Sequence, residues 1–411
     1  MNHLHAKLLG SLCLAAIHAQ GMCATPKAEV IHWWTSGGEA AAVRQFADAY
    51  RAAGGTWIDT AIAGSEQSRS VTFNRIVGGK SPTAAQFNTS RQFHDLVEQD
   101  LLHPLDDVAK REGWAKNMPQ VVVDAVRVKG RFMAAPVSVH MPTWIWYSKS
   151  AFRKAGIAAE PTNFDELFAA LDKLRAAGLV PLAHGGQSWQ DSIVFTAVLA
   201  NMGGRELYLK IMRDRDPRAI ASAEFRKVLT TYKRLQSYVD PGSPGRNWND
   251  ATSMLISGKA GIQIIGDWAK GEFALAKQVP GKDYGCIPGF GAKAPYIIQG
   301  DVFVFPKASG SDVIAAQDLL AAVVTAPTTQ VEFSVLKGSI PVRMDVDRQR
   351  LDVCAQAGLT AMNDPARQVG NGEMYMTPDQ NGALTDVLTA FWNKSIPVDK
   401  VQRDIAAALA D

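Results

Sequence analysis

The sequence lacks the short motifs by which many nucleotide-binding and hydrolytic enzymes are recognised. Its 411 residues contain no Walker loop, no dinucleotide fingerprint, no nucleophile elbow and no zinc-spaced cluster of histidines and cysteines. The eight histidines are scattered, and His3, His5 and His18 lie close to the N-terminus. We therefore expect no metal, no cofactor and no enzymatic activity.

Net charge and long apolar runs are also scarce. The net charge of +3 gives no reason to expect binding to nucleic acid or to an anionic membrane surface. An apolar stretch over residues 8–17 follows Lys7 and is too short to span a bilayer, and small residues continue up to Ala24. This layout predicts a cleaved signal peptide over residues 1–24 and an exported mature protein.

Cysteine is rare, with four residues in the whole chain. Two of them lie in the expected leader, which leaves Cys286 and Cys354 in the mature protein. An oxidising compartment favours a disulfide between them, but two unpaired thiols fit the sequence equally well, because spacing alone does not fix the geometry that a disulfide needs.

The remaining residues, roughly 385, are enough for two or three domains. Strand-like and helix-like segments alternate along them, starting with a strand at 30–34 and a helix at 39–53. Alternation of this kind is typical of α/β proteins, in which helices cover a largely parallel sheet. We find no internal repeat and no low-complexity segment.

The first predicted strand ends in two aromatic residues and is followed by a carboxylate. Trp33 and Trp34 close the apolar run, and a pair of glycines leads to Glu39. A flat ring covers the C–H face of a pyranose and a carboxylate accepts hydrogen bonds from hydroxyl groups, so this arrangement suits a sugar. Both indoles would also fit the core of an ordinary strand.

Similar residues recur at other predicted strand and helix ends. The strand over 83–88 places Gln86 and Asn88 on one face, where the two amides could bind hydroxyl groups or cap a turn. Trp248 opens a predicted helix, while Trp268 follows a buried strand and could pack in the core. Asp301 precedes an apolar strand, and the sequence KGSIP begins at Lys337 at the end of a helix.

These segments occur in the order IHWWTSGGE (31–39), PTAAQFN (82–88), GDW (266–268) and KGSIP (337–341). In this order the chain resembles the periplasmic sugar-binding proteins of ABC importers, the extracellular solute-binding protein family 1, and within it the glucose/mannose-binding branch. The resemblance implies an α/β fold with two lobes of the type II periplasmic binding protein kind, joined by crossover hinge segments around a ligand cleft.

The resemblance also implies how the chain is divided. It predicts an N-terminal lobe from residues 25–138 and 298–343 and a C-terminal lobe from 139–297 and 344–411. The three crossovers are expected near 135–143, 294–299 and 341–352.

The ligand contacts implied by the resemblance come from both lobes. Trp34 is expected to stack on the sugar with Trp33 behind it, while Glu39, Gln86 and Asn88 bind hydroxyl groups from the first lobe. The remaining expected contacts are Trp248, Trp268, Asp301 and Lys337. At the position of Asn88 the glucose branch usually has a basic residue, and Gln380 aligns where the family has a histidine. Neutral amides at both places should change which sugar is preferred.

The predicted function is therefore a periplasmic receptor, a monomer, that closes on a neutral mono- or small oligosaccharide and delivers it to an inner-membrane ABC permease. A secreted glycosidase with Glu39 and Asp301 as its two carboxylates is one alternative. A two-lobed binder of a polyamine, peptide or anion is another, but such cargo would require several charges of one sign at the strand ends.

Overall fold

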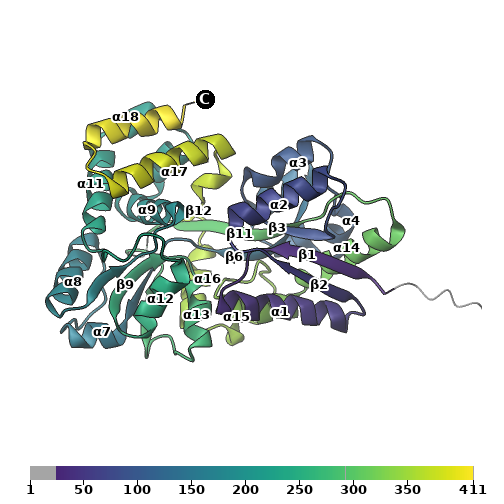
Figure 1. Ribbon diagram of the computed structural model, residues 1–411, viewed down its shortest axis with the longest axis horizontal. Coiled ribbons are helices and arrows are strands. Elements are labelled where there is room, and N and C mark those ends of the chain that lie inside the picture. Colours follow the sequence, from purple (N-terminus) through teal and green to yellow (C-terminus); the bar gives the residue numbers. More distant parts are fainter. Residues whose placement is uncertain (1–24, 292, 411) are drawn as a thin grey trace, which may run out of the picture.

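The computed structural model describes residues 25–291 and 293–410. The predicted signal peptide, residues 1–24, lies outside the described residues. The chain forms two α/β lobes, each with its own sheet and its own covering helices (Figure 1). Among the described residues no single helix has the length and apolar character to cross a bilayer. Helices α14 (Ser311–Val324) and α15 (Pro327–Lys337) meet these criteria only together, across a bend of 67°.

The strands are β1 (Lys27–His32), β2 (Thr56–Ala61), β3 (Ala84–Asn88), β4 (Arg127–Val128), β5 (Arg131–Phe132), β6 (Ala134–His140), β7 (Trp144–Ser148), β8 (Val180–Ala183), β9 (Ala260–Ile265), β10 (Tyr284–Ile287), β11 (Tyr296–Val304) and β12 (Gln368–Gly370). The first sheet has the order β12-β11-β3-β1-β2. Strand β6 also belongs to this sheet and pairs with β11 on the side opposite β3. The second sheet has the order β10-β7-β9-β8, and β4 pairs with β5 in a hairpin.

The helices of the first half of the chain are α1 (Gly37–Ala52), α2 (Ser65–Val77), η1 (Arg91–Phe93), α3 (His94–Glu98), α4 (Asp106–Arg111), α5 (Trp114–Asn117), α6 (Gln120–Val126), α7 (Lys149–Lys154), α8 (Phe164–Ala176) and α9 (Ser188–Met212). Helix α9 is interrupted at Gly204, where φ is 61°. A residue with a side chain adopts this left-handed conformation only at a cost, so the kink suits glycine.

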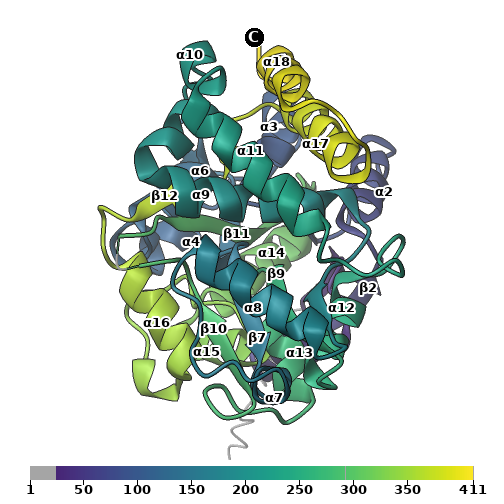
Figure 2. The same cartoon turned by 90° about the vertical axis from the view of Figure 1, so that its left-hand side faces the viewer.

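The later helices are α10 (Pro217–Ile220), α11 (Ala223–Gln236), α12 (Trp248–Ile256), α13 (Ala269–Leu275), α14 (Ser311–Val324), α15 (Pro327–Lys337), η2 (Arg348–Arg350), α16 (Val353–Met362), η3 (Gly372–Met374), α17 (Pro378–Asn393) and α18 (Val398–Ala408). Helices α1 and α15 pack together below the first sheet, and α2 lies on its other face (Figure 1). Helices α17 and α18 pack on α9 and α11 although they are distant in sequence (Figure 2).

Strand β11 is the central connection between distant parts of the chain. Its residues 301–304 pair antiparallel with β3 on one side and, over 299–304, with β6 on the other. Strand β6 then passes through residues 141–143 into β7 of the second sheet, and β10 of that sheet leads back into β11. The ends of β3 and β6 thereby meet the middle of β11, where Asn88 pairs with Asp301 and His140 with Gln299.

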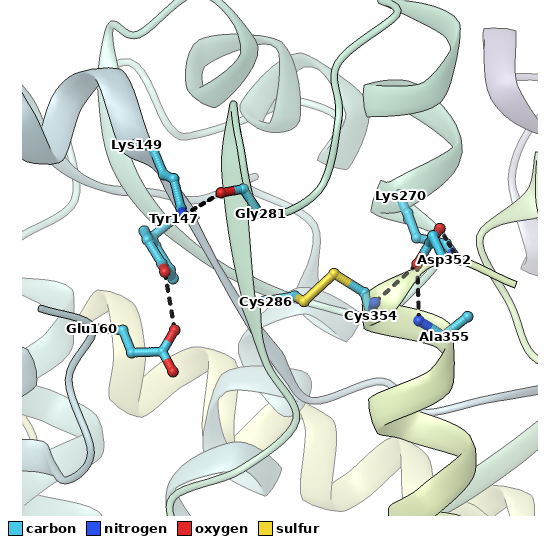
Figure 3. The surroundings of a disulfide bond; sticks show 9 residues. All are labelled: Tyr147, Lys149, Glu160, Lys270, Gly281, Cys286, Asp352, Cys354 and Ala355. Carbon is cyan, nitrogen blue, oxygen red and sulfur yellow. Dashed lines mark hydrogen bonds and ion pairs between the residues drawn. A yellow bond between two sulfur atoms is a disulfide. The ribbon is translucent and has the colours of Figure 1, made fainter.

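A disulfide joins Cys286 in β10 to Cys354 in α16, which lie 68 residues apart (Figure 3). Next to it, the Lys270 ammonium lies 2.9 Å from the Asp352 carboxylate, and this aspartate also caps the N-terminus of α16. The start of α16 is thus tied to the second sheet by a covalent bond and to α13 by an ion pair.

Candidate binding cleft

A cavity of about 900 Å³ lies between the two lobes. Of the ten tryptophans in the chain, six are buried and four are partly exposed. Those four, Trp33, Trp189, Trp248 and Trp268, all line this cavity. An indole in partial contact with solvent keeps one face free for a ligand, so the cavity is the natural place to look for binding.

The two adjacent tryptophans point in different directions. Strand β1 ends at His32, and the Trp33 N–H donates to Gln86 Oε1 at 3.0 Å, which leaves the Trp33 indole at the cavity wall. Trp34 is only 1% exposed. Its ring lies 5.2 Å from the ring of Phe333 and 5.7 Å from that of Phe303.

The exposures of the two indoles are therefore the reverse of what we expected. Trp34 was expected to face the ligand with Trp33 behind it, but Trp34 fills an apolar site between the sheet and helices α1 and α15. Successive residues of an extended chain point to opposite sides, so only one indole of the pair can face the cleft.

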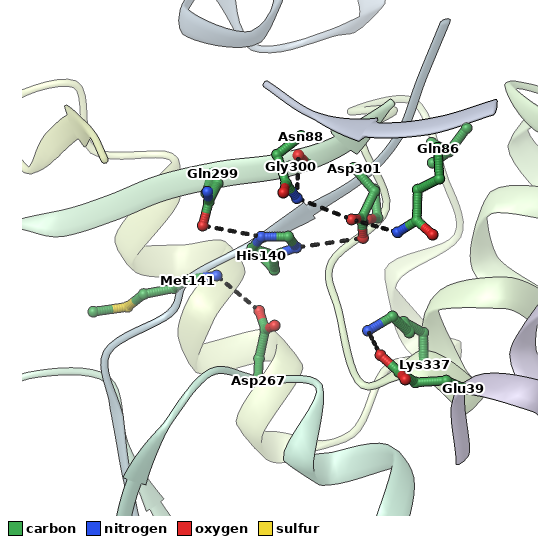
Figure 4. Close-up of polar contacts among 12 residues, drawn as sticks. Glu39, Gln86, Asn88, His140, Met141, Asp267, Gln299, Gly300, Asp301 and Lys337 are labelled. Carbon is green, nitrogen blue, oxygen red and sulfur yellow. Dashed lines mark hydrogen bonds and ion pairs between the residues drawn. The ribbon is translucent and has the colours of Figure 1, made fainter. Parts of the chain in front are cut away.

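A buried ion pair joins the helix ends on this side of the cleft. Glu39 lies in the first turn of α1, Lys337 is the last residue of α15, and Nζ is 2.9 Å from Oε1 (Figure 4). Burial by itself would lower the pKa of Lys337, but the charges of Glu39 and Asp301 outweigh it and raise this pKa. The carboxylate at a helix N-terminus and the ammonium at a helix C-terminus also suit the two helix dipoles.

Asp301, in β11, is surrounded by donors from the two neighbouring strands β3 and β6. Its Oδ1 accepts from Gln86 Nε2 at 3.0 Å and Asn88 Nδ2 at 3.2 Å (Figure 4). Its Oδ2 accepts from Ser138 Oγ at 3.0 Å. Burial would raise the pKa of Asp301, but the nearby His140 outweighs this effect and lowers it. A carboxylate offers about four acceptor positions, so the protein itself uses most of them and Asp301 mainly orients its neighbours.

His140 and Gln299 line the cavity but were not predicted from the sequence. His140 ends β6, its Nδ1 lies 3.5 Å from Asp301 Oδ2, and its ring meets that of Trp268 edge-on at 5.2 Å. Burial lowers the pKa of His140, and the charge of Asp301 more than compensates, so this pKa is raised. The strand-end argument that selected Asp301 applies equally to His140, since the crossover at 135–143 contains it.

The second lobe contributes three of the four partly exposed indoles. Trp248 begins α12 and its carbonyl accepts from Gln263 Nε2 at 3.1 Å, while Trp268 directly follows Asp267 after β9. Trp189, in the first turn of α9, lies 6.2 Å from Trp268 and was missed. The sequence QSWQ around it, with an indole between polar residues at a helix start, has the same pattern that drew attention to Trp248.

Asp267 connects the second lobe to the first crossover. Its Oδ2 accepts from the Met141 N–H at 3.0 Å, and its own N–H donates to the Met141 carbonyl (Figure 4). The second carboxylate oxygen is buried without a hydrogen-bond partner among the described residues. Burial raises the pKa of Asp267 to about 7, with His140 opposing the shift.

Gln380 does not lie at the cavity, in contrast to the expectation from its alignment. It is the third residue of α17 and forms a capping box with Thr377, while its Nε2 also donates to the carbonyls of Leu409 and Ala410. The side chain is therefore held at the helix start. The next residue, Asn381, faces the cavity instead.

The other predicted contacts are brought together. Glu39, Asn88, Asp301 and Lys337 line the cavity with all four predicted tryptophans, although Trp34 is only 1% exposed, and Gln86 supports them from behind. We call the region around Trp268, His140, Asp301 and the Glu39–Lys337 pair the inner end of the cleft. Among the described residues, no group of three or more His, Cys, Asp or Glu side chains could hold a metal ion.

A family comparison agrees with this architecture. The model for bacterial extracellular solute-binding proteins matches residues 34–330. The chain belongs to this family.

Similar sequences come from other bacteria. A probable sugar-binding periplasmic protein of Rhizobium meliloti is 36% identical over 411 residues, which cover 98% of this chain and 97% of the relative. One of Mesorhizobium japonicum is 38% identical over 415 residues, covering 98% and 99%.

Solved structures share the two-lobed fold. The bacterial solute receptor AcbH, described as having an exclusive preference for β-D-galactopyranose, superposes with a TM-score of 0.78 at 17% identity, over 93% of this chain and 97% of AcbH. Maltose-bound MalE3 of T. maritima superposes with a TM-score of 0.76 at 18% identity, over 93% and 98%. At these identities the match shows the fold, which is that of two-lobed periplasmic binding proteins.

Proposed function

We propose that this protein is the periplasmic substrate-binding protein of an ABC sugar importer. It binds a neutral mono- or small oligosaccharide of the glucose/mannose type, acts as a monomer exported by a cleaved signal peptide, and delivers the sugar to an inner-membrane permease. The observation that carries the proposal is the convergence of all four partly exposed tryptophans on one cleft with amides and paired charges. Relatives across nearly the whole chain are named as probable sugar-binding periplasmic proteins, which supports it.

The mechanism is closure of the two lobes. Trp33, Glu39 and Asn88 contact the sugar from the first lobe, whereas Trp248 and Trp268 contact it from the second. Contacts to both lobes at once exist only in the closed state, so the sugar shifts the equilibrium towards closure. The charges at the inner end are paired within the protein, which favours hydroxyl groups over a charged solute as the ligand.

The arrangement of the carboxylates favours binding over glycoside hydrolysis. Glu39 is paired with Lys337, and Asp301 accepts hydrogen bonds from Gln86, Asn88 and Ser138. A glycosidase needs one carboxylic acid that protonates the leaving group and one carboxylate near the anomeric carbon. The pKa of Asp301 is lowered, which does not suit a general acid. The Glu39 carboxylate is held in its ion pair with Lys337.

The test is a thermal-shift and calorimetric screen of the mature protein against neutral sugars. A sugar at a hundred times its Kd should stabilise the fold by about 2.7 kcal/mol. Trp268→Leu should weaken binding at least a hundredfold, whereas Trp57→Phe, a matched change at a buried tryptophan outside the cleft, should leave the Kd within twofold. A melting temperature raised by amino acids or polyamines but by no sugar would refute the proposal.

A further inference from the structure

The cleft extends beyond its inner end. Helix α2 of the first lobe contributes Glu66 and Arg69 to one wall, and α9 and α17 of the second lobe contribute Trp189 and Thr385 to the other. The volume of about 900 Å³ lies near the top of the range of roughly 300–1,000 Å³ found for small-molecule sites. This is more space than one hexose ring fills, so we call the part bounded by Arg69, Trp189 and Glu373 the outer end of the cleft.

Arg69 is a cation at the outer end that forms no ion pair among the described residues. Within the described part of the chain its guanidinium has no ion pair and no hydrogen bond, although Cζ lies 5.9 Å from the centre of the Trp33 ring. Burial lowers the pKa of Arg69. A guanidinium that is partly removed from water is normally held by a carboxylate. Because Arg69 has no such ion pair among the described residues, its N–H donors are available to a ligand that enters the cleft.

Glu373 lines the same cavity, in η3, and accepts one hydrogen bond, from Gln299 Nε2 at 3.2 Å. Burial raises the pKa of Glu373, and the charge of Arg69 opposes the shift. Among the described residues, Arg69 and Glu373 form no ion pair with each other. A group that only donates and a group that only accepts thus face the same space from α2 and η3.

Trp189 supplies an apolar surface in the same cavity, next to Trp268. It is half-buried, lines the cavity and lies 6.2 Å from Trp268 with the two ring planes inclined by 52°. Behind it, Ser192 Oγ donates to Thr385 Oγ1 at 3.3 Å and links α9 to α17. Two indoles in sequence along one wall offer stacking surfaces for two successive sugar rings.

We propose that the outer end of the cleft binds the second hexose unit of a neutral di- or oligosaccharide, with Trp189 against the ring, Arg69 donating to its hydroxyl groups and Glu373 accepting from them. This inference rests on the proposed function and narrows its substrate to sugars longer than one unit. A neutral sugar unit is favoured because a hydroxyl group both donates and accepts hydrogen bonds. It can accept from the Arg69 guanidinium and donate to the Glu373 carboxylate. An acidic sugar would face Glu373 and Glu66 as well as Arg69.

The test compares each monosaccharide with its own disaccharides by titration calorimetry, using glucose with maltose and cellobiose, and mannose with mannobiose. At least one disaccharide should bind ten times more tightly than its monosaccharide. Arg69→Met, Glu373→Gln and Trp189→Ala should each reduce that ratio at least fivefold. Arg44→Met, which removes an exposed arginine outside the cleft, should leave the ratio unchanged.

Three results would overturn this inference, and they are distinct from failure of the proposed function. The first is a monosaccharide that binds as tightly as every disaccharide of the panel. The second is that Arg69→Met and Glu373→Gln weaken the binding of a monosaccharide and of its disaccharide by the same factor. The two charges would then form a closure contact between the lobes. The third is a ratio that the three variants do not change. If no sugar binds at all, the proposed function fails and this inference fails with it.

Discussion

The inner and outer ends of the cleft differ in how their charged side chains are partnered. At the inner end Lys337 lies 2.9 Å from Glu39, and Asp301 accepts from three side chains. At the outer end Arg69 has no ion pair among the described residues and Glu373 accepts a single hydrogen bond. The inner end is therefore organised before a ligand arrives, whereas the outer end lacks partners that a ligand can provide.

This difference has an energetic consequence. Donors and acceptors already held in place lose little conformational freedom when a ligand binds, so they contribute mainly orientation and specificity. Charges that are desolvated without a partner reduce the stability of the empty protein. Substitutions at the two ends should therefore affect folding stability in opposite ways.

The largest effect is expected for Lys337→Met. Loss of the ammonium leaves the Glu39 carboxylate, with 10% of its side chain exposed, without its ion-pair partner. Breaking a buried pair in this way costs about 3–5 kcal/mol of unfolding free energy. Arg69→Met removes an unpartnered cation and should change the unfolding free energy by less than about 0.5 kcal/mol or increase it. Urea denaturation of both variants measures the comparison.

The double variant Glu39→Gln/Lys337→Met is the control for this contrast. It removes both charges, so at least half of the stability lost in Lys337→Met should return. Equal destabilisation by Lys337→Met and Arg69→Met would show that the two ends do not differ in the way their contacts suggest.

A second, smaller effect concerns Asp267, which ties the second lobe to the first crossover. Its pKa is raised to about 7 in the folded protein from an ordinary value of 3.8. Between about pH 4 and pH 7 the folded state keeps this proton while the unfolded state has lost it, so stability falls as pH rises. At about 1.4 kcal/mol per pKa unit, the loss reaches at most about 4 kcal/mol.

Asp267→Asn should remove this contribution and keep an acceptor for the Met141 N–H. Unfolding free energies measured at pH 4.5 and pH 7.5 should therefore fall less with pH in the variant than in the unmodified protein. The charges of Asp267 and His140 act on each other, so the difference between the two curves reports the titration of Asp267 together with its effect on His140. Parallel curves would mean that Asp267 is ionised across this range.

Strand-end reasoning selected Gln86, Asn88 and Asp301, and the sheet shows why these three side chains meet. Gln86 and Asn88 lie two residues apart on β3, so they share a face, and β3 pairs with β11 so that Asn88 is opposite Asp301. Both amides donate to the same carboxylate oxygen as a result. Local periodicity was enough to place Gln86 and Asn88 on one face, whereas their grouping with Asp301 was an expectation from the family resemblance.

The outer end was not predictable in the same way. Arg69 is an ordinary polar residue in the middle of α2, and Glu373 follows a short strand far along the chain. They share a cavity only because η3 and α2 are placed by long-range packing. The choice between Trp33 and Trp34 also depends on tertiary structure, since the phenylalanines around Trp34 come from α1, β11 and α15.

The smallest effect is expected for Gln380→Ala, at the residue that alignment placed with the ligand. The change removes one half of the capping box of α17 and the contacts to the C-terminal carbonyls, which should cost about 0.5–1 kcal/mol of unfolding free energy. Because Gln380 is absent from the cavity wall, the Kd for sugar should stay within twofold. Asn381→Ala is the matched variant, since the neighbouring amide faces the cavity, and it should raise the Kd for a disaccharide more than it lowers stability. A tenfold loss of affinity in Gln380→Ala, with Asn381→Ala unaffected, would restore Gln380 to the ligand and would mean that α17 moves when the lobes close.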